Sequence, residues 1–327
     1  MILVNNPGSW SAVYEPLEHA KWHGWTFTDM VFPFFLWISG VAMTLSFAKR
    51  RAEGVDKSRL LAQAARRAGL IILIGFLFNL VPAFDFEHVR IPGVLQRIGV
   101  CYFFAALIYL YTSRRGQCVA AGLLLAVYLG LMLYAPFPGE LPDRWSIDAN
   151  FERYVDGKLL EGHIYRGSKY WDPEGLISTL PAIVTVLCGA LARKFFRAGI
   201  VLFAAGFAAS YVIPINKNLW TPSYVLLMAG LASLVYGALH EFIEVRGYRK
   251  GWKFFQVYGT NAIVSYIISG ILARVLNLSG LGEVVYKNVL LTIASPINAS
   301  LLYALMNVAI VFSFVYLLYR REILLRL

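Results

Sequence analysis

The sequence predicts an all-α protein that crosses a membrane many times. Two features of its composition predict this class: 58% of the 327 residues are hydrophobic, and only 15% are charged. A soluble protein of this length would carry about a quarter charged residues, so the apolar excess requires a lipid environment. The third observation is segment length, since the apolar runs are long enough to span a bilayer as helices that satisfy their own backbone hydrogen bonds.

The apolar runs follow one another along the whole chain, which we treat as one transmembrane domain over residues 1–327. About ten helices are expected from their lengths. The first is represented only by the apolar stub at residues 1–6, which we interpret as the end of a truncated helix. The remaining spans are expected at residues 28–48, 68–82, 91–111, 117–135, 175–192, 199–214, 219–240, 252–276 and 296–319.

Basic residues cluster in every second loop and at the C-terminus, and they predict the orientation. Such loops face the cytoplasm in membrane proteins. The net charge of +11 therefore reflects topology, and no nucleic-acid partner is expected. Arg193 and Arg326 are two of these basic residues, and the cytoplasmic loops are residues 49–67, 112–116, 193–198 and 241–251.

The alternate loops face outward, and the longest is the extracytoplasmic loop 136–174. It contains eight acidic residues and five Lys or Arg, together with many aromatic residues. These rings are suited to stacking on sugars, but an aromatic belt at a membrane interface has the same composition. Both interpretations stay open for Trp145, Tyr154, Tyr165, Tyr170 and Trp171.

The first outward loop holds the polar residues best suited to chemistry. Asn5 and Asn6 precede His19, and Asp29 opens the next apolar helix. A histidine is suited to taking a proton from an amine or hydroxyl near neutral pH. Asp29 either orients that histidine or complements the helix dipole. Composition alone favours the interpretation that these are ordinary interfacial polar residues beside an aromatic belt.

Arg97 lies six residues inside an expected span, beside Gln96. An arginine in a membrane helix costs about 2.5–3.5 kcal/mol unless it is paired or faces water. We therefore expect a partner, with Asp29 or Glu174 as candidates. The pairing either stabilises the fold or holds a substrate.

Further polar residues stand at the outer ends of later spans. The turn 214–220 brings together amides and an ammonium group that are suited to holding hydroxyls or an anion, and a late span carries Asn261. No spacing of His, Cys, Asp or Glu matches a metal site, so no metal is expected. The residues of the turn are Asn216, Lys217 and Asn218.

Six segments together resemble the heparan-α-glucosaminide N-acetyltransferase family and its bacterial relatives. They occur in order along nearly the whole chain, and several motifs in sequence carry more weight than any one of them. The segments are EHAKWHGWT (18–26), DMVFPFF (29–35), IPGVLQRIG (91–99), DPEGL (172–176), PINKNLW (214–220) and LYRREI (318–323).

The resemblance implies a transmembrane acyltransferase fold. It also implies transfer of an acetyl group from cytoplasmic acetyl-CoA to the amine of a glucosamine-type sugar on the other side of the membrane. The essential histidine of the family falls on His19, and its asparagine falls on Asn5, with Asn6 as the second match. His19 would act as a base or carry the acetyl group, Asn5 would bind the oxyanion, and Asp29 would orient His19. Substrate contacts are expected from Asn6, Gln96, Arg97, Glu174, Asn216, Lys217, Asn218 and Asn261.

Two other functions fit the same pattern of residues. A transporter of amino sugars or cell-wall fragments would also place polar groups inside the membrane. An enzyme that acylates polysaccharide hydroxyls would use a similar architecture. The expected partners are the lipid bilayer and an amino-sugar or oligosaccharide acceptor, and the expected location is a bacterial inner membrane. A homodimer and a monomer stay open.

Overall fold

In the computed structural model, residues 1–168, 170–192 and 194–324 are described, and every regular element among them is a helix. Arg193 and Arg326 lie outside the described residues. The chain forms two compact units. We call residues 1–20, 26–31 and 241–327 the terminal unit, and residues 21–25 and 32–240 the central unit. The all-α class is confirmed.

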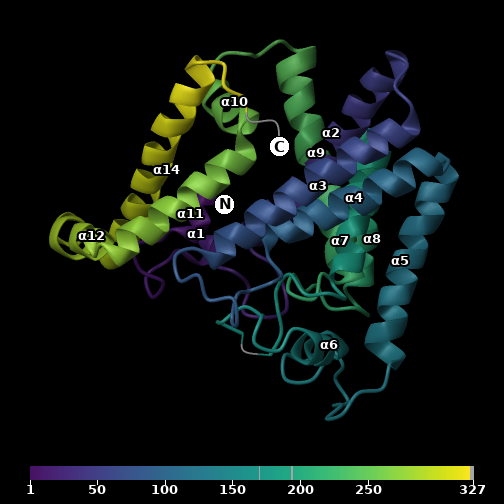
Figure 1. The fold of residues 1–327 in the computed structure, drawn as a ribbon, viewed down its shortest axis with the longest axis horizontal. Coiled ribbons are helices and arrows are strands. Elements are labelled where there is room, and N and C mark those ends of the chain that lie inside the picture. Colours follow the sequence, from purple (N-terminus) through teal and green to yellow (C-terminus); the bar gives the residue numbers. More distant parts are fainter. Residues whose placement is uncertain (169, 193, 325–327) are drawn as a thin grey trace. The chain divides into compact units, whose positions relative to one another are not determined.

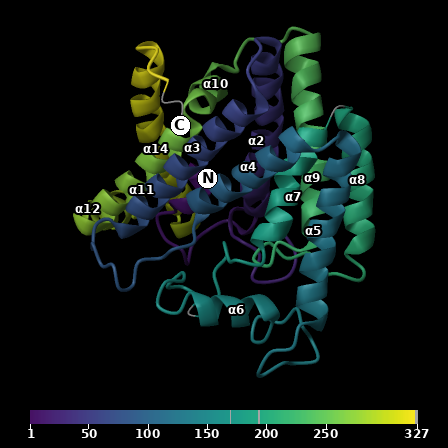
Figure 2. The same cartoon turned by 45° about the vertical axis from the view of Figure 1, so that its right-hand side comes forward.

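The central unit is a helical bundle (Figures 1 and 2). Helices α3 and α4 run side by side, and so do α8 and α9, while α7 packs against α4, α5 and α9. The short helix α6 lies within the loop 136–174. The helices are α2 (Phe27–Ala52, whose first residues belong to the terminal unit), α3 (Lys57–Leu80), α4 (Val94–Tyr111), α5 (Arg114–Tyr134), α6 (Phe151–Leu159), α7 (Thr179–Leu191), α8 (Phe195–Ala209) and α9 (Pro222–His240).

Two glycines allow α2 and α7 to approach closely. A Cβ atom on Gly40 of α2 would lie 2.0 Å from the carbonyl oxygen of Val186. A Cβ atom on Gly189 of α7 would lie 1.9 Å from the carbonyl oxygen of Trp37. Small residues at such crossings let helix backbones pack tightly without a hydrophobic driving force between them.

The terminal unit combines the start of the chain with its last helices. Helix α14 packs against α1, α10 and α11. The elements are α1 (Ile2–Asn5), the 3₁₀ helix η1 (Glu15–Leu17), the π-helix η2 (Glu241–Val245), α10 (Lys253–Thr260), α11 (Ala262–Leu278), α12 (Leu281–Val284), the π-helix η3 (Val285–Leu290), α13 (Leu291–Ile293) and α14 (Pro296–Arg320).

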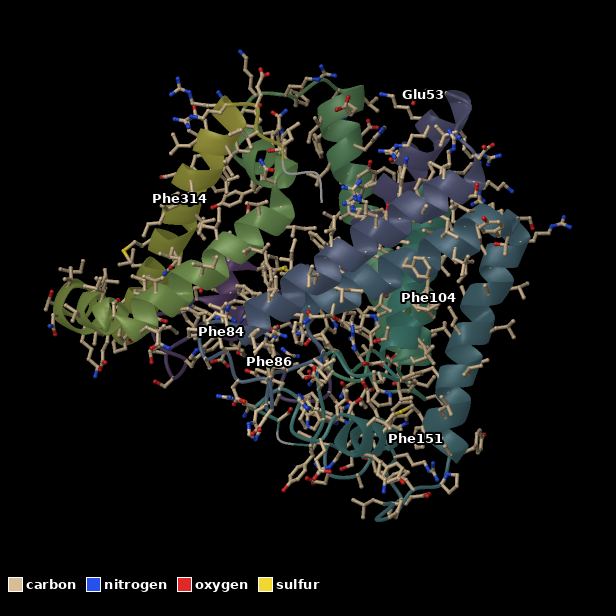
Figure 3. All side chains as sticks on the ribbon, viewed as in Figure 1. Glu53, Phe84, Phe86, Phe104, Phe151 and Phe314 are labelled. Atoms are coloured by element: carbon tan, nitrogen blue, oxygen red, sulfur yellow. The ribbon has the colours of Figure 1, made fainter. Side chains whose placement is uncertain are left out.

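Six helices of the described residues are long and apolar enough to cross a membrane, and a seventh crossing results if the bent pair α10 and α11 counts as one. Helices α7 and α8 are apolar but shorter, at 13 and 15 residues. Fewer crossings are therefore found by length alone than the sequence predicts. Exposed aromatic side chains such as Phe104 and Phe314 project from these helices (Figure 3), as expected for surfaces that face lipid.

The expected span 68–82 was too short, because α3 begins at Lys57. Gly54, at φ +83°, ends α2, so the loop before α3 is short. The eleven extra residues contain four Lys or Arg, which we had assigned to a loop. Lys and Arg are good helix formers, and long side chains reach out of an apolar phase towards water. Charge alone therefore did not mark the helix boundary.

The expected span 252–276 is not one continuous helix, because α10 and α11 meet at an angle of 85°. Asn261 stands at the bend with φ −130° and ψ 46°, outside the helical region. Its side-chain amide donates to the carbonyl oxygen of Ile323 at 3.1 Å. Gly259 and Thr260 precede it, and both are weak helix formers.

Candidate functional site

His19 and Asp29 lie together in the terminal unit. His19 Nδ1 is 2.7 Å from Asp29 Oδ1. Because an ionised carboxylate can only accept, the proton between them belongs to Nδ1, and Nε2 is then the basic nitrogen of the ring. The His19 side chain is 46% exposed, whereas that of Asp29 is 1% exposed. The pair therefore presents a histidine to a ligand and keeps the carboxylate out of water.

The chain around Asp29 fixes its carboxylate. Asp29 lies in the first turn of α2, where the helix dipole favours a negative charge. Its Oδ2 atom accepts hydrogen bonds from the backbone N–H groups of Ala20 and Thr26, both at 3.0 Å. The loop that carries His19 thus closes around the same carboxylate that holds the His19 ring, and this sets the orientation of the ring.

The two candidate asparagines differ in their surroundings. Asn6 is buried, and its amide donates to the carbonyl oxygen of Ile2 at 2.7 Å and to Ser269 Oγ at 2.9 Å. Asn5, the last residue of α1, is exposed. Asn6 is therefore bound within the fold, while Asn5 is the one whose amide can meet a ligand.

A cavity of about 410 Å³ lies beside both asparagines in the terminal unit. Asn307 of α14 lines it and is 1% exposed. The Asn307 amide donates to the carbonyl oxygen of Tyr303 at 3.0 Å, while its Oδ1 atom has no partner among the described residues. A buried acceptor without a partner is costly, and an N–H or O–H group of a ligand would satisfy it. Other lining residues are Asn277, Glu283, Tyr286, Lys287 and Tyr303.

Arg97 is buried in the central unit without the carboxylate partner that we expected. Its Nη2 atom donates to the carbonyl oxygen of Gly175 at 2.9 Å and to Ser178 Oγ. Its guanidinium carbon lies 5.2 Å from the centroid of the Trp220 ring, a cation–π contact. The Nε and Nη1 atoms have no partner among the described residues. The guanidinium group of Arg97 therefore contacts neutral groups, and not the carboxylate of Asp29 or Glu174 that we expected.

Glu174 binds Arg90 instead. Arg90 Nε donates to Asp172 Oδ2 at 2.8 Å, and its Nη2 atom also binds Asp172 Oδ1 and Glu174. This bidentate pair joins the loop before α4 to the loop before α7. The sequence offered little sign of it, because Arg90 stands outside the apolar runs, where an arginine carries no cost.

Trp220 is a residue that the sequence reasoning did not single out. It is 1% exposed and adopts a positive φ of 51°, which is rare for a bulky residue. Its indole N–H donates to Thr185 Oγ1 at 3.0 Å. Strained conformations of this kind persist where the surrounding structure fixes them, often beside functional sites. Its position in the segment 214–220 was the one available signal.

The outward turn 214–220 is held by Asn216, which is fully buried. Asn216 Oδ1 accepts from the backbone N–H of Leu219 at 2.9 Å, and its amide lies 3.4 Å from His23 Nδ1. Burial lowers the pKa of His23, against an opposing effect of the Asp143 charge. Lys217 and Asn218 are half-buried on the same turn.

The remaining two candidates lie inside their own units. Gln96 packs against α3, with its Oε1 atom 2.5 Å from where a Cβ atom on Gly75 would stand. Asn261 shapes the bend between α10 and α11 in the terminal unit. The structure thus brings His19 to Asp29 within the terminal unit, which also contains Asn5 and Asn6. The central unit contains the other candidates: Gln96, Arg97, Glu174 and the turn 214–220. Among the described residues, no group of three or more His, Cys, Asp or Glu is arranged to hold a metal ion.

The chain is similar to two curated proteins, although no family model matches it. Heparan-alpha-glucosaminide N-acetyltransferase of Homo sapiens is 30% identical over 336 aligned residues, and the Mus musculus protein of the same name is 29% identical. Each alignment covers 82% of this chain and 50% of the relative, so the chain spans about half the length of these proteins. These matches support the family that the sequence motifs indicate: over most of its length, the chain is similar to heparan-alpha-glucosaminide N-acetyltransferase.

Proposed function

We propose that this protein is a membrane-bound N-acetyltransferase that moves an acetyl group from cytoplasmic acetyl-CoA to the amine of a glucosamine-type sugar on the extracytoplasmic side. The similarity to two N-acetyltransferases supports the reaction class. The observation that carries the proposal is the His19–Asp29 pair, because it supplies a fixed and accessible base at the position that the family motif assigns to the essential histidine.

In the proposed reaction, the neutral amine nitrogen of the sugar attacks the thioester carbonyl, and Nε2 of His19 takes a proton from that nitrogen. Asp29 stabilises the imidazolium that forms, because its carboxylate already accepts from Nδ1. The carbon–sulfur bond then breaks, the amide is formed, and the thiolate of CoA leaves and takes up the proton from His19. In the alternative order, Nε2 of His19 attacks the thioester and displaces the CoA thiolate, which forms an acetyl-histidine. The sugar amine then attacks this acetyl group, the Nε2–acetyl bond breaks, and the amine proton passes to the thiolate of CoA.

Asn5 is proposed to donate its side-chain N–H to the oxyanion of the tetrahedral intermediate. Its exposure and its place beside a cavity of about 410 Å³ support this role. The unpartnered Oδ1 atom of Asn307 in the same cavity would accept from an amide or hydroxyl group of a substrate. The cavity therefore offers both a donor and an acceptor.

The proposed topology places the basic loops and the C-terminus in the cytoplasm of a bacterium, with the protein in the inner membrane. We further propose that α7 and α8 cross the membrane with help from flanking residues. Together with the six crossings found by length, and with the bent pair α10 and α11 taken as one more, they would account for the nine spans expected after the first loop. Labelling of single cysteines introduced at Gly54 and at Asp148 with an impermeant maleimide tests the orientation. Labelling of Asp148→Cys from outside, and of Gly54→Cys only after lysis, is expected.

Transfer from labelled acetyl-CoA to glucosamine by the purified chain tests the reaction. Formation of labelled N-acetylglucosamine by the wild type is expected. The proposal would be contradicted if the protein, shown to be folded by a cooperative thermal melting transition, formed no product with glucosamine or with glucosamine oligosaccharides. To separate the two orders of bond change, the protein is mixed with acetyl-CoA alone. An acetyl group on His19 would support the covalent order.

A further inference from the structure

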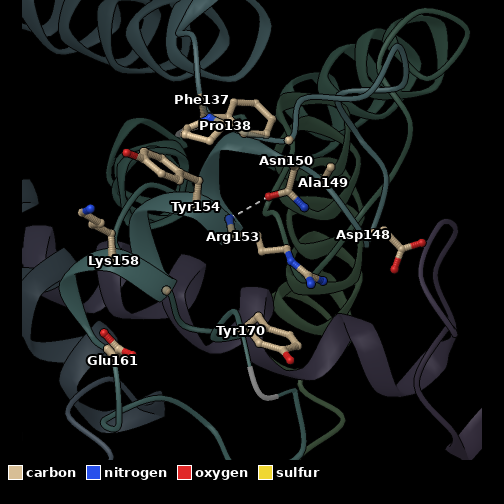
Figure 4. A pocket seen from close by; sticks show the side chains of 12 residues that line it. Phe137, Pro138, Asp148, Ala149, Asn150, Arg153, Tyr154, Lys158, Glu161 and Tyr170 are labelled. Carbon is tan, nitrogen blue, oxygen red and sulfur yellow. Dashed lines mark hydrogen bonds between the residues drawn. The ribbon is translucent and has the colours of Figure 1, made fainter.

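The extracytoplasmic loop contains a pocket of about 400 Å³ in the central unit, and none of the residues assigned to the reaction lines it (Figure 4). It is built on α6 and on the chain segments at either end of the loop. This volume falls in the range of small-molecule sites. Its lining includes Phe137, Asp148, Arg153, Tyr154, Lys158 and Tyr170.

The buried face of α6 fixes the position of the pocket. Asp156 is fully buried and accepts from the backbone N–H groups of Asp172 at 3.1 Å and Leu176 at 3.0 Å. Glu152, also buried, accepts from the backbone N–H of Ser178 at 3.3 Å. These two carboxylates therefore bind α6 to the chain segment before α7. Because this face of the helix is anchored, the opposite face, which lines the pocket, is held in a fixed position.

Aromatic rings stand on the open face of α6. The Tyr154 ring stacks on Phe137 with centroids 6.1 Å apart and an angle of 27°. Tyr170 is 56% exposed, and the guanidinium carbon of Arg153 lies 4.6 Å from the centroid of its ring. Figure 4 shows Tyr154 and Tyr170 on different sides of the lining, with Arg153 between them. Large apolar rings with a polar tip are suited to ligands that have both an apolar and a hydroxylated face.

The charged groups of the lining balance one another. Arg153 and Lys158 supply donors, while Asp148 and Glu161 supply acceptors. An anionic ligand would meet the two carboxylates, and a purely apolar ligand would offer no hydrogen bond to any of the four charged groups. A neutral pyranose fits both the rings and the mixed donors and acceptors, because it carries C–H faces and hydroxyl edges.

We infer that this pocket is a saccharide subsite that binds a neutral pyranose unit of an oligosaccharide acceptor, apart from the unit that is acetylated. The inference rests on the proposed function for the identity of the acceptor. Trp145 and Trp171 of the same loop lie in a packed cluster instead: Trp22 donates to the carbonyl oxygen of Trp145 at 2.8 Å, and its ring packs edge-on against Trp171. The loop therefore contains both a packed aromatic cluster and an open aromatic site.

Isothermal titration of the full-length protein with a β-1,4-linked tetramer of N-acetylglucosamine tests the inference. This probe has no free amine, so its binding does not depend on acetyl transfer. We compare the wild type with Tyr170→Ala, Tyr170→Phe and the control Tyr211→Ala, since Tyr211 is an exposed tyrosine elsewhere in the central unit. Binding by Tyr170→Ala should be roughly five- to tenfold weaker, and binding by Tyr170→Phe and Tyr211→Ala should match the wild type.

Equal affinity of Tyr170→Ala and the wild type, or no binding by the wild type, would overturn the inference. Kinetics with an amine-bearing glucosamine tetramer supply a second readout. Tyr170→Ala should raise the KM for the tetramer and leave kcat/KM for glucosamine unchanged. Binding that depends on Tyr170, in a protein that transfers no acetyl group, would retain the subsite and reject the proposed function. The two failures are thus distinguishable.

Discussion

Two histidine–aspartate pairs in this protein use the same ring nitrogen but have different surroundings. His19 Nδ1 lies 2.7 Å from a carboxylate that is 1% exposed, and His88 Nδ1 lies 3.1 Å from Asp85, which is 36% exposed. Asp29 accepts from the backbone N–H of Thr26 in its own turn and from that of Ala20, nine residues away, whereas Asp85 accepts only within a local turn, from Glu87 and His88. The two pairs are therefore distinguished by the burial and anchoring of the carboxylate more than by the contact distance.

The largest expected effect comes from replacing the two histidines in turn. His19→Ala removes the proposed base and should lower kcat by about 10² to 10⁴. His88→Ala should change kcat less than about twofold, since an exposed pair contributes little. Acetyl transfer to glucosamine, measured on equal amounts of folded protein, checks both. Similar losses in the two variants would show that the structural distinction has no functional meaning.

Replacing the carboxylate of each pair by an amide tests the same comparison. Asp29→Asn keeps the shape of the side chain but allows the histidine to adopt the wrong tautomer, so a loss of about 10² or more in kcat is expected. It also places an amide N–H group where two backbone donors converge, and the melting temperature should fall. Asp85→Asn serves as the matched control and should leave both quantities near the wild type.

The two asparagines separate catalysis from stability within the terminal unit. Asn5→Ala removes the proposed oxyanion donor and should lower kcat by about 10² to 10³ with little change in melting temperature. Asn6→Ala removes two hydrogen bonds at a buried position and should lower the melting temperature more than Asn5→Ala does. A reversed pattern would move the oxyanion role to Asn6.

The smallest expected effect is a pH dependence of loop stability that comes from Asp156, a buried carboxyl group that is not paired with a histidine. Burial raises its pKa to about 6, against the hydrogen bonds from Leu176 and Asp172 and the charge of Arg97, which lower it. Burial also raises the pKa of neighbouring Glu152. Because the folded pKa exceeds the unfolded value of 3.8, the folded loop binds more protons. The protonated Asp156 carboxyl group therefore stabilises the folded loop fully below pH 3.8, and this stabilisation is lost as the pH rises through 6.

Hydrogen exchange of the loop 136–174, corrected for the intrinsic rate, measures this dependence. Protection should fall between pH 4 and pH 7 by a factor on the order of ten. Asp156→Asn should flatten the dependence, whereas Asp148→Asn, at an exposed position on the same loop, should leave it unchanged. Protection that rises with pH would contradict the sign derived from the raised pKa.

The sequence predicted the helical class and pointed to the loop in which the structure brings His19 to Asp29, because hydropathy and short motifs are local signals. It did not predict that α3 begins at Lys57 or that α10 and α11 bend by 85°, since packing and one asparagine outside the helical region decide these features. The partner of Arg97 was missed for a similar reason. A charge inside a span predicts that a partner exists, but the carbonyl group of Gly175 and the hydroxyl group of Ser178 leave no mark in the sequence.

Transfer across a sealed vesicle tests the central claim most directly. The wild type, His19→Ala and His88→Ala are reconstituted with labelled acetyl-CoA enclosed and glucosamine outside. If His19 is the base for transfer across the membrane, labelled N-acetylglucosamine is expected in the outer solution for the wild type and His88→Ala, and almost none for His19→Ala. Equal product from His19→Ala and the wild type, or product from the wild type only when both substrates share one compartment, would contradict this claim.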